Sequence, residues 1–202
     1  PLEVTTNRFM KRTFDLVFSG LVCLLIFPFL VPIVGLLIKL ESKGPVFFKQ
    51  TRSGINYSPF GCYKFRTMSV NMDSDKKQAT VGDSRITRVG AFLRKTSIDE
   101  LPQFFNVLIG DMSVVGPRPH MIEHTRMYSK LIKPFVVRHW VKPGITGLAQ
   151  AKGYRGETKE VQQMLDRVKM DVFYIQHWSF ALDTRIVWRT ILNMITFQKQ
   201  GF

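Results

Sequence analysis

The segment LVFSGLVCLLIFPFLVPIVGLLI, residues 16–38, carries no charged side chain from end to end. A helix needs about 20 apolar residues to cross a bilayer, so this segment is long enough to be a membrane element. A signal peptide is disfavoured because no small-residue cleavage site follows the segment. A straight spanning helix is the ordinary interpretation of such hydropathy.

Two features of the segment favour a different path through the membrane. Pro28 and Pro32 lie near its middle, where each removes a backbone donor and predicts a bend. Cations flank both ends, at residues 11–12 and at Lys39 and Lys43, so the positive-inside bias assigns no direction. We therefore expect a re-entrant helix that breaks at its prolines and returns to the side from which it entered.

The length and charge of the chain limit what else it can be. Its 202 residues suit one domain with a sizeable core plus a membrane element, and we place these in residues 42–202 and 1–41. The 29 Lys and Arg exceed the 15 Asp and Glu, which gives a net charge of +14 and implies anionic partners. Nucleic acid, anionic lipid headgroups and phosphorylated small molecules all remain open on charge alone. With only Cys23 and Cys62 present, neither a disulfide framework nor a cysteine metal site is indicated.

The rest of the chain predicts an α+β fold that is mostly helical. Apolar groups between Gly and Pro in residues 42–68 predict short strands joined by turns. Residues 86–108 and 158–175 have helical patterns, and residues 110–119 and 142–156 are typical of tight loops.

The tail, residues 185–197, predicts an amphipathic helix. Its apolar stripe comprises Ile186, Trp188, Ile191, Leu192 and Ile195. Such a helix either lies in the headgroup plane of a membrane or packs its stripe on the domain core. The pattern alone leaves both alternatives open.

The motif SIDELPQ, residues 97–103, places Asp99 and Glu100 side by side in a basic chain. Ser97 and Glu100 have the spacing of a capping box, and Pro102 costs an intrahelical hydrogen bond, so we expect the acids at a helix start or beside a kink. The pair can bind Mg²⁺, supply a nucleophile, or decorate a helix N-terminus. Consecutive helical residues point about 100° apart, which favours different tasks for the two acids.

Several cations border segments punctuated by Gly and Pro, and a guanidinium can hold a phosphate bidentately. These residues are Lys64, Arg66, Arg85, Arg88, Arg94, Arg118 and Arg155. Taken singly, each is more often a solvated surface charge, so phosphate binding requires that they converge on one cleft. The sequence contains no G-K-[ST] P-loop and no G-x-S-x-G elbow. A carboxylate that attacks phosphorus, with Mg²⁺ and cations to neutralise the phosphate oxygens, remains open.

The chain resembles the monotopic phosphoglycosyl transferases of bacteria, also called bacterial sugar transferases, over nearly its whole length. The resemblance rests on the following segments: KRTFD (11–15), GPVFFKQTRSG (44–54), YKFRTM (63–68), GAFLRKTSIDELPQFFNVLIGDMSVVGPRP (90–119), PGITGLAQ (143–150) and DVFYIQHWSFALD (171–183). It also fits the catalytic portion of larger members, which carry additional membrane helices.

The resemblance implies an enzyme that moves a sugar 1-phosphate from a UDP-sugar to undecaprenyl phosphate and releases UMP with the help of Mg²⁺. Such a step begins the synthesis of a surface polysaccharide or glycoconjugate. The resemblance makes Asp99 the nucleophile and Glu100 an assistant in metal binding or orientation, with both acids as candidate metal ligands. It also implies a substrate-binding set of Lys64, Arg66, Arg94, Pro117, Arg118, Pro119, Arg155 and Asp171.

The same resemblance implies where the enzyme works. Residues 1–41 would form a re-entrant helix-break-helix, and residues 42–202 a catalytic domain with interfacial amphipathic helices at the cytoplasmic face of the bacterial inner membrane. Membrane lipid and a possible homodimer partner are expected, and nucleic acid is not. A competing hypothesis is a basic membrane-anchored binding module, whose binding would weaken steeply with salt and would not depend on Asp99.

Overall fold

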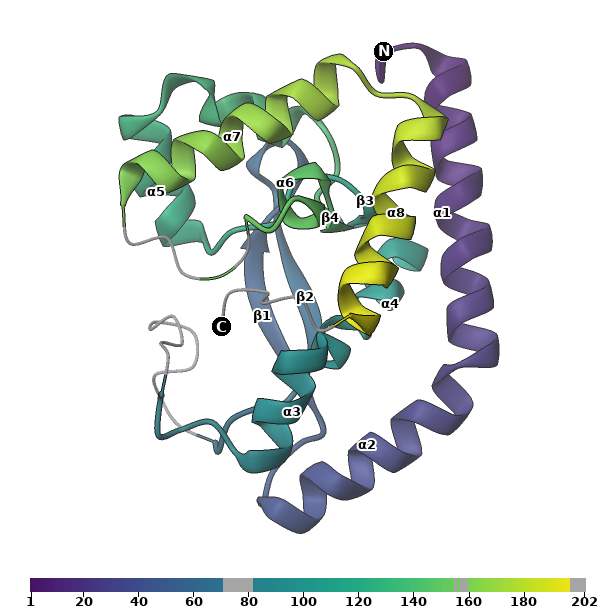
Figure 1. The fold of residues 1–202 in the computed structure, drawn as a ribbon, viewed down its shortest axis with the longest axis vertical. Coiled ribbons are helices and arrows are strands. Elements are labelled where there is room, and N and C mark those ends of the chain that lie inside the picture. The colour runs from purple at the N-terminus through teal and green to yellow at the C-terminus, as the bar shows by residue number, and fades with distance from the viewer. Residues whose placement is uncertain (71–81, 155, 157–159, 197–202) are drawn as a thin grey trace.

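In the computed structural model, two N-terminal helices run along one side and the lower end of the body that the strands and the remaining helices form (Figure 1). The structure describes residues 1–70, 82–154, 156 and 160–196. The helices are α1 (Thr5–Leu25), α2 (Phe27–Glu41), α3 (Arg88–Thr96), α4 (Gln103–Ile109), α5 (Ile122–Leu131), α6 (Leu148–Ala151), α7 (Val161–Gln176) and α8 (Phe180–Ile195). The strands are β1 (Phe47–Ser53), β2 (Pro59–Phe65), β3 (Ser113–Val115) and β4 (Gly144–Thr146).

The apolar segment forms two helices joined at a sharp bend. Within the described residues, no one helix is both long and apolar enough to cross a bilayer, whereas α1 and α2 meet that condition together and are bent by 60° at their junction. The predicted helix-break-helix geometry is therefore confirmed, although the break falls at Ile26 rather than at the prolines. Pro28 lies in the first turn of α2, where no intrahelical donor is needed, and Pro32 lies inside α2.

The strands form two small sheets. Strands β1 and β2 make the antiparallel hairpin expected from residues 42–68, in a register that pairs Gln50 with Cys62. Strands β3 and β4 are parallel, with Ser113 opposite Gly144. The prediction of loops at residues 110–119 and 142–156 was therefore wrong in part, because these three-residue strands are too short to show an alternating pattern.

Polar contacts attach α1 to the body of the protein. Lys11 Nζ donates to Asp183 Oδ2 on α8 at 2.7 Å and to the carbonyl of Val115 at 2.9 Å. The indole of Trp178 also donates to Asp183, at 3.0 Å, and Tyr174 Oη lies 2.8 Å from the same carboxylate. This buried network explains Lys11 of the KRTFD motif as a structural group.

Two further residues of the KRTFD motif extend this attachment to β3 and α4. Asp15 Oδ1 accepts hydrogen bonds from Ser113 Oγ at 2.9 Å and from the amide of Val114 at 2.8 Å. Arg12 donates to the carbonyls of Val107 and Leu108 at 2.7 and 3.0 Å. Carbonyls in the last turn of a helix lack intrahelical partners, so Arg12 satisfies the C-terminal end of α4.

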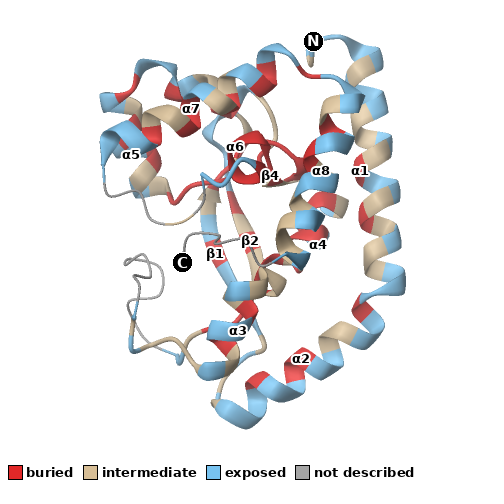
Figure 2. Cartoon of the chain, in the orientation of Figure 1, coloured by how far each residue is buried: buried red, intermediate tan, exposed pale blue. Residues whose placement is uncertain are grey.

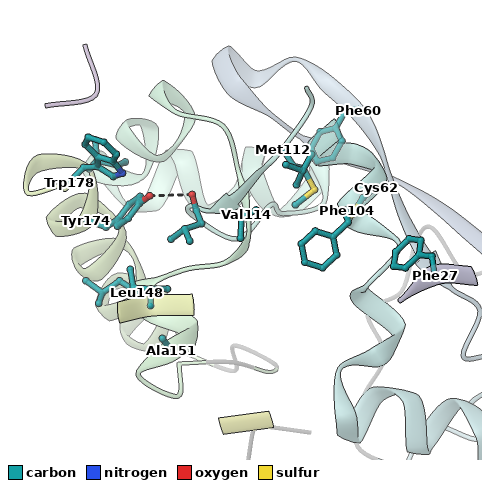
Figure 3. Close-up of a cluster of buried hydrophobic side chains, with 14 residues drawn as sticks. Phe27, Phe60, Cys62, Phe104, Met112, Val114, Leu148, Ala151, Tyr174 and Trp178 are labelled. Atoms are coloured by element: carbon teal, nitrogen blue, oxygen red, sulfur yellow. Dashed lines mark hydrogen bonds between the residues drawn. The ribbon is translucent and has the colours of Figure 1, made fainter. Parts of the chain in front are cut away.

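The main core lies where α1, α4, β3, α7 and α8 meet. Figure 3 shows part of it, with Tyr174, Val114 and Phe104 pointing into the cluster and the hydrogen bond from Tyr174 Oη to a carbonyl of β3. Phe27, at the start of α2, is buried in the same cluster and stacks edge-on against Phe105 with ring centroids 5.0 Å apart. The bend of the N-terminal pair is therefore packed against α4.

The far end of α2 is joined to α3 by one carboxylate. Glu41, the last residue of α2, accepts hydrogen bonds from the amides of Arg88 and Val89 at 2.6 and 2.9 Å. The first amides of a helix have no intrahelical acceptor, so Glu41 caps α3 from outside. The helix that leads to Asp99 is thereby tied to the N-terminal pair.

Apolar side chains cover the outer surface of the N-terminal helices. Those at least 60% exposed on α1 and α2 are Phe9, Leu24, Leu25, Phe29, Ile33, Leu36 and Leu40. Figure 2 shows exposed residues along the outer sides of both helices. On α8, Ile186 is buried in the core, whereas Trp188 and Ile195 are 64% and 67% exposed. The stripe is therefore split: Ile186 packs on the core, as one alternative predicted, whereas a position of the exposed part in the headgroup plane stays a prediction.

The Lys11–Asp183 network yields a stability prediction. In Asp183→Asn, Lys11 keeps its charge but loses its buried counter-ion, so we expect the free energy of unfolding to fall by about 3 kcal/mol. Thermal unfolding in detergent measures this, as a midpoint lower by about 2–4 °C for each kcal/mol. The control Asp166→Asn removes an acid from an exposed pair with Lys169 and should change the midpoint by about 1 °C or less. Equal midpoints for the two variants would contradict the structural role of Asp183.

Candidate active site

Asp99 and Glu100 lie in a single 3₁₀ turn, Ile98–Glu100, between α3 and α4. Ser97 adopts a left-handed conformation with a φ of 58°, which ends α3 and turns the chain toward α4. The expected position beside a kink is confirmed. The capping box was wrong, because Ser97 ends α3 and makes no side-chain cap hydrogen bond to the turn that follows.

A close helix contact sets the position of Arg94. Gly90 of α3 packs tightly against the backbone that follows β2. A Cβ added at Gly90 would lie 2.0 Å from the carbonyl oxygen of Thr67. This approach lets Arg94 Nε donate to Thr67 Oγ1 at 2.8 Å. Burial lowers the pKa of Arg94, and the nearby negative charge of Asp99 opposes that shift. Arg94 is thus held in the same neighbourhood as the acids.

Glu100 is the paired member of the two acids. Lys64 Nζ on β2 donates to Glu100 Oε1 at 2.7 Å. Arg118 holds both carboxylate oxygens, with Nη1 at 3.0 Å from Oε2 and Nη2 at 2.5 Å from Oε1. This bidentate pair is the strong form of a charge-assisted hydrogen bond and raises the pKa of Arg118. Glu100 therefore brings together two of the predicted substrate-binding cations.

Asp99 is the unpaired member. It is buried, 8% exposed, and within the described part of the chain no side chain or amide hydrogen-bonds or ion-pairs with its carboxylate. Burial raises its pKa to about 6, with Glu100 adding to the shift and the positive charges of Lys64, Arg94 and Arg118 opposing it. A carboxylate in this state is ionised at neutral pH and has its oxygens available to a ligand.

The loop that carries Arg118 is supported from behind by a buried ion pair. Arg138 Nη2 donates to the carbonyl of Arg118 at 3.0 Å, and Arg138 Nε donates to Asp171 Oδ2 at 2.7 Å. Both side chains of the pair are almost fully buried, so Asp171 acts on the site through Arg138. Sequence reasoning did not select Arg138, because it lies in a mixed apolar and basic stretch with no motif of its own. In the structure Asp171 is a positioning residue, and a direct substrate contact stays a prediction.

Pro117 and Pro119 flank Arg118 in a small hollow beside the tip of the hairpin. The hollow is lined by Ser53, Gly54, Pro117, Arg118, Pro119, Arg138, His139, Val141 and Pro143. A nucleotide contact at this turn stays a prediction.

Two other predicted phosphate ligands have different outcomes. The nitrogens of Arg66 donate to the carbonyls of Pro45, Ser42 and Met68 and to Ser42 Oγ, at 2.6–3.4 Å. Through these contacts Arg66 fixes the chain after α2, and a phosphate contact by Arg66 stays a prediction. Arg155 lies outside the described residues, so its role stays a prediction.

A match to one protein family covers both the N-terminal helices and the residues of the site. Residues 6–197 match the family described as "Bacterial sugar transferase". The chain belongs to the bacterial sugar transferase family. The matched range includes the KRTFD segment, which attaches α1 to the rest of the protein, and the Asp-Glu pair between α3 and α4.

Three family relatives illustrate the similarity. A "UDP-glucose:undecaprenyl-phosphate glucose-1-phosphate transferase" of Klebsiella pneumoniae is 50% identical over 188 residues, covering 93% of this chain and 40% of the relative. The "Exopolysaccharide production protein PSS" of Rhizobium leguminosarum bv. phaseoli is 46% identical over 199 residues, covering 96% of this chain and 98% of the relative. A "UDP-N-acetylgalactosamine-undecaprenyl-phosphate N-acetylgalactosaminephosphotransferase" of Aeromonas hydrophila is 42% identical over 190 residues, covering 93% of this chain and 44% of the relative. The chain therefore spans less than half the length of two of these three relatives.

The Asp-Glu pair of this family member can be tested for its fit to Mg²⁺. Among the described residues, no three His, Cys, Asp or Glu side chains converge as a metal site. Mg²⁺ often binds one or two carboxylates and completes its shell with water and substrate phosphate oxygens. Asp99 fits such a ligand because its carboxylate is available, whereas both oxygens of Glu100 face cations. Asp99 therefore fits Mg²⁺ when a phosphorylated substrate supplies further oxygens, and Glu100 as a metal ligand stays a prediction.

The raised pKa of Asp99 leads to a stability prediction for this bacterial sugar transferase. Because its folded pKa of about 6 exceeds the ordinary value of 3.8, ionised Asp99 destabilises the fold above pH 6, and this cost disappears below about pH 4. We expect Asp99→Asn to raise the thermal midpoint at pH 7.5, by an amount corresponding to about 1–3 kcal/mol. At pH 4 the midpoints of variant and parent should coincide. A midpoint lowered by Asp99→Asn at pH 7.5 would show that the carboxylate stabilises the fold.

Proposed function

We propose that the chain is the catalytic part of a phosphoglycosyl transferase that moves a sugar 1-phosphate from a UDP-sugar to undecaprenyl phosphate and releases UMP. The observation that carries this proposal is Asp99, a buried carboxylate that is open to a ligand and surrounded by Lys64, Arg94 and Arg118. A group that must attack an anionic phosphate needs this combination of an available oxygen pair and nearby positive charge. The names of the relatives support the same donor and acceptor classes.

The proposed reaction has two displacements at one phosphorus atom. In the first, an Asp99 carboxylate oxygen bonds to the phosphorus that bears the sugar, and the bond from that phosphorus to the bridging diphosphate oxygen breaks. UMP leaves with the electron pair of that bond, and an aspartyl-phosphosugar remains. In the second, a phosphate oxygen of undecaprenyl phosphate attacks the same phosphorus and the bond to Asp99 breaks. The products are a diphosphate-linked sugar lipid and a regenerated carboxylate.

The surrounding residues prepare Asp99 for this reaction. Lys64 and Arg118, placed by Glu100, bring positive charge to the side on which phosphate oxygens would accumulate. Arg94, fixed on Thr67, adds another cation from α3. Mg²⁺, held by Asp99 and the substrate phosphates with Glu100 nearby, would neutralise further phosphate charge when bound. Burial of Asp99 weakens its solvation, which leaves the carboxylate more reactive than an exposed one.

The N-terminal helices support a position at a membrane surface. Their outward apolar side chains, together with Trp188 and Ile195 of α8, have no cover in the described chain. A bent pair with cations at both ends would dip into one leaflet and return, at the cytoplasmic face of the inner membrane where UDP-sugars are made. In that position the polyprenyl acceptor and the soluble donor can reach the same carboxylate.

UMP release from a panel of UDP-sugars, with Mg²⁺ and undecaprenyl phosphate, tests the activity. UDP-glucose is the first donor to try, because the Klebsiella relative named for it is 50% identical whereas the Aeromonas relative named for UDP-N-acetylgalactosamine is 42% identical. We expect Asp99→Asn to lower kcat by at least about 10³-fold while its fold is retained. Asp166→Asn, on the exposed side of α7, should keep parental turnover.

The pH dependence adds an independent check on Asp99 as the nucleophile. Since the attacking group must be ionised, kcat/KM should rise with pH along an acid limb whose midpoint is about 6, set by the free enzyme. An unchanged turnover in Asp99→Asn would exclude the mechanism. Absence of UMP with every donor, combined with salt-sensitive binding of nucleic acid, would favour the binding-module hypothesis instead.

Labelling of single cysteines tests the re-entrant path. Thr6→Cys and Lys43→Cys place thiols at exposed positions near the two ends of the bent pair, in a background where Cys23 is replaced by Ser and the buried Cys62 is kept. We expect a membrane-impermeant maleimide to label both positions from the cytoplasmic side of oriented vesicles. The background without an added cysteine serves as the blank. Labelling of the two positions from opposite sides would identify a spanning segment.

A further inference from the structure

Arg167 on α7 is a buried cation that the structure leaves incompletely satisfied. The residue is 9% exposed, and its Nη2 donates to the carbonyl of Gly156 at 2.9 Å. Its Nε is buried, and no residue that the structure describes hydrogen-bonds to it. No carboxylate in the described chain forms an ion pair with it. A buried donor without an acceptor costs about 1–3 kcal/mol, more when charged, so this arrangement calls for an explanation.

The charges around Arg167 are mostly positive. Burial lowers its pKa to about 10, and the next causes are the positive charges of Arg118 and Arg138. The nearby acid, Asp171, is already paired with Arg138 at 2.7 Å. Arg118 is likewise paired with Glu100, which also accepts from Lys64. Arg167 thus adds a positive charge to a group of cations whose acids are engaged elsewhere.

A comparison within the chain argues against a purely structural role. Arg66 is buried to a similar degree, 6% exposed, and its nitrogens are satisfied by carbonyls and a hydroxyl of the segments it joins. To the residues that the structure describes, Arg167 makes one such bond, and its Nε has no acceptor among them. An arginine selected to hold a loop would be expected to resemble Arg66. An arginine selected to bind an anion would keep a donor available among other cations, as Arg167 does.

We propose that Arg167 binds a phosphate group of the reactants, with Nε donating to a phosphate oxygen that Arg118 contacts from its other side. This rests on the proposed function for the identity of the reactants. The side chain of Arg118 is 34% exposed, so the shared position can be reached from solvent. The ligand chemistry is a phosphate oxyanion, and its source is either the diphosphate of the nucleotide-sugar or the phosphate of the polyprenyl acceptor. The anion site formed by Lys64 of β2 and Arg94 of α3 would thereby extend to Arg167 of α7.

Binding of inorganic pyrophosphate to the full chain in detergent tests the anion site without turnover. Titration followed by the thermal midpoint gives an apparent affinity for the parent, Arg167→Gln and Arg167→Lys. The control Lys169→Gln removes the same charge from the same helix, at a side chain that is 59% exposed. We expect Arg167→Gln to bind pyrophosphate about tenfold more weakly and Lys169→Gln to match the parent. Arg167→Lys should lie between them, because it keeps the charge and loses the planar guanidinium.

Steady-state kinetics then identifies the source of the phosphate. A raised KM for the UDP-sugar in Arg167→Gln assigns the donor diphosphate, and a raised KM for undecaprenyl phosphate assigns the acceptor. Parental pyrophosphate affinity in Arg167→Gln would overturn the proposal, as would parental affinity in Arg167→Lys if Arg167→Gln does not fold. Weakened pyrophosphate binding in a protein that turns over no UDP-sugar would sustain the anion site and reject the proposed function, so the two failures are distinguishable.

Discussion

The carboxylate of Asp99 is the group on which the arrangement of the site depends. A buried negative charge is costly unless opposite charges surround it, and within the described chain those charges lie near Asp99 without bonding to it directly. Glu100 makes this possible, because it takes the direct contacts of Lys64 and Arg118 for itself. Adjacent acids therefore have opposite roles, one engaged in placing cations and the other left available.

The charges continue outward from the pair in a chain of contacts. Glu100 holds Arg118, the carbonyl of Arg118 is held by Arg138, and Arg138 is paired with Asp171 on α7. Each of these buried charges is stabilised by its partner. Removal of one partner would therefore leave the other as an uncompensated buried charge. The chain of contacts explains how an acid on α7 can influence a site built by α3 and the hairpin. It also ends beside Arg167, where the positive charges exceed the available acids.

The N-terminal helices are built into this body rather than attached to its edge. The KRTFD residues place α1 against α4, β3 and α8, and Glu41 connects the far end of α2 to the start of α3. The apolar surface of the helix pair and the helix that leads to Asp99 are consequently held in one geometry. For an enzyme that joins a soluble donor to a lipid acceptor, such a connection would set the depth of the reacting carboxylate at the membrane surface.

Local patterns in the sequence determined the features that depend on neighbouring residues along the chain. The uncharged segment with Pro28 and Pro32 predicted two helices and a bend, because a proline cannot donate an intrahelical hydrogen bond, although the break lies at Ile26 and Pro32 lies inside α2. The hairpin of residues 47–65 and the kink at the Asp-Glu pair followed from the same kind of punctuation by Gly and Pro. The resemblance of SIDELPQ and GPRP to a family motif selected Asp99, Glu100 and Arg118, and the structure brings Glu100 into contact with Arg118 and Lys64 near Asp99.

Only the tertiary structure decided what each arginine does. Arg66 and Arg118 looked equivalent in sequence, yet one donates to carbonyls near its own strand and the other holds Glu100. Arg138 and Arg167 carried no sequence signal, because folding brings Arg138 to the carboxylate of Asp171 and the carbonyl of Arg118, and Arg167 to the carbonyl of Gly156. A long cationic side chain has similar local preferences wherever it lies, so its role is set by the acceptors that folding brings to it. For Arg118 and Arg138 those acceptors lie on segments distant in sequence, beyond the reach of any local pattern.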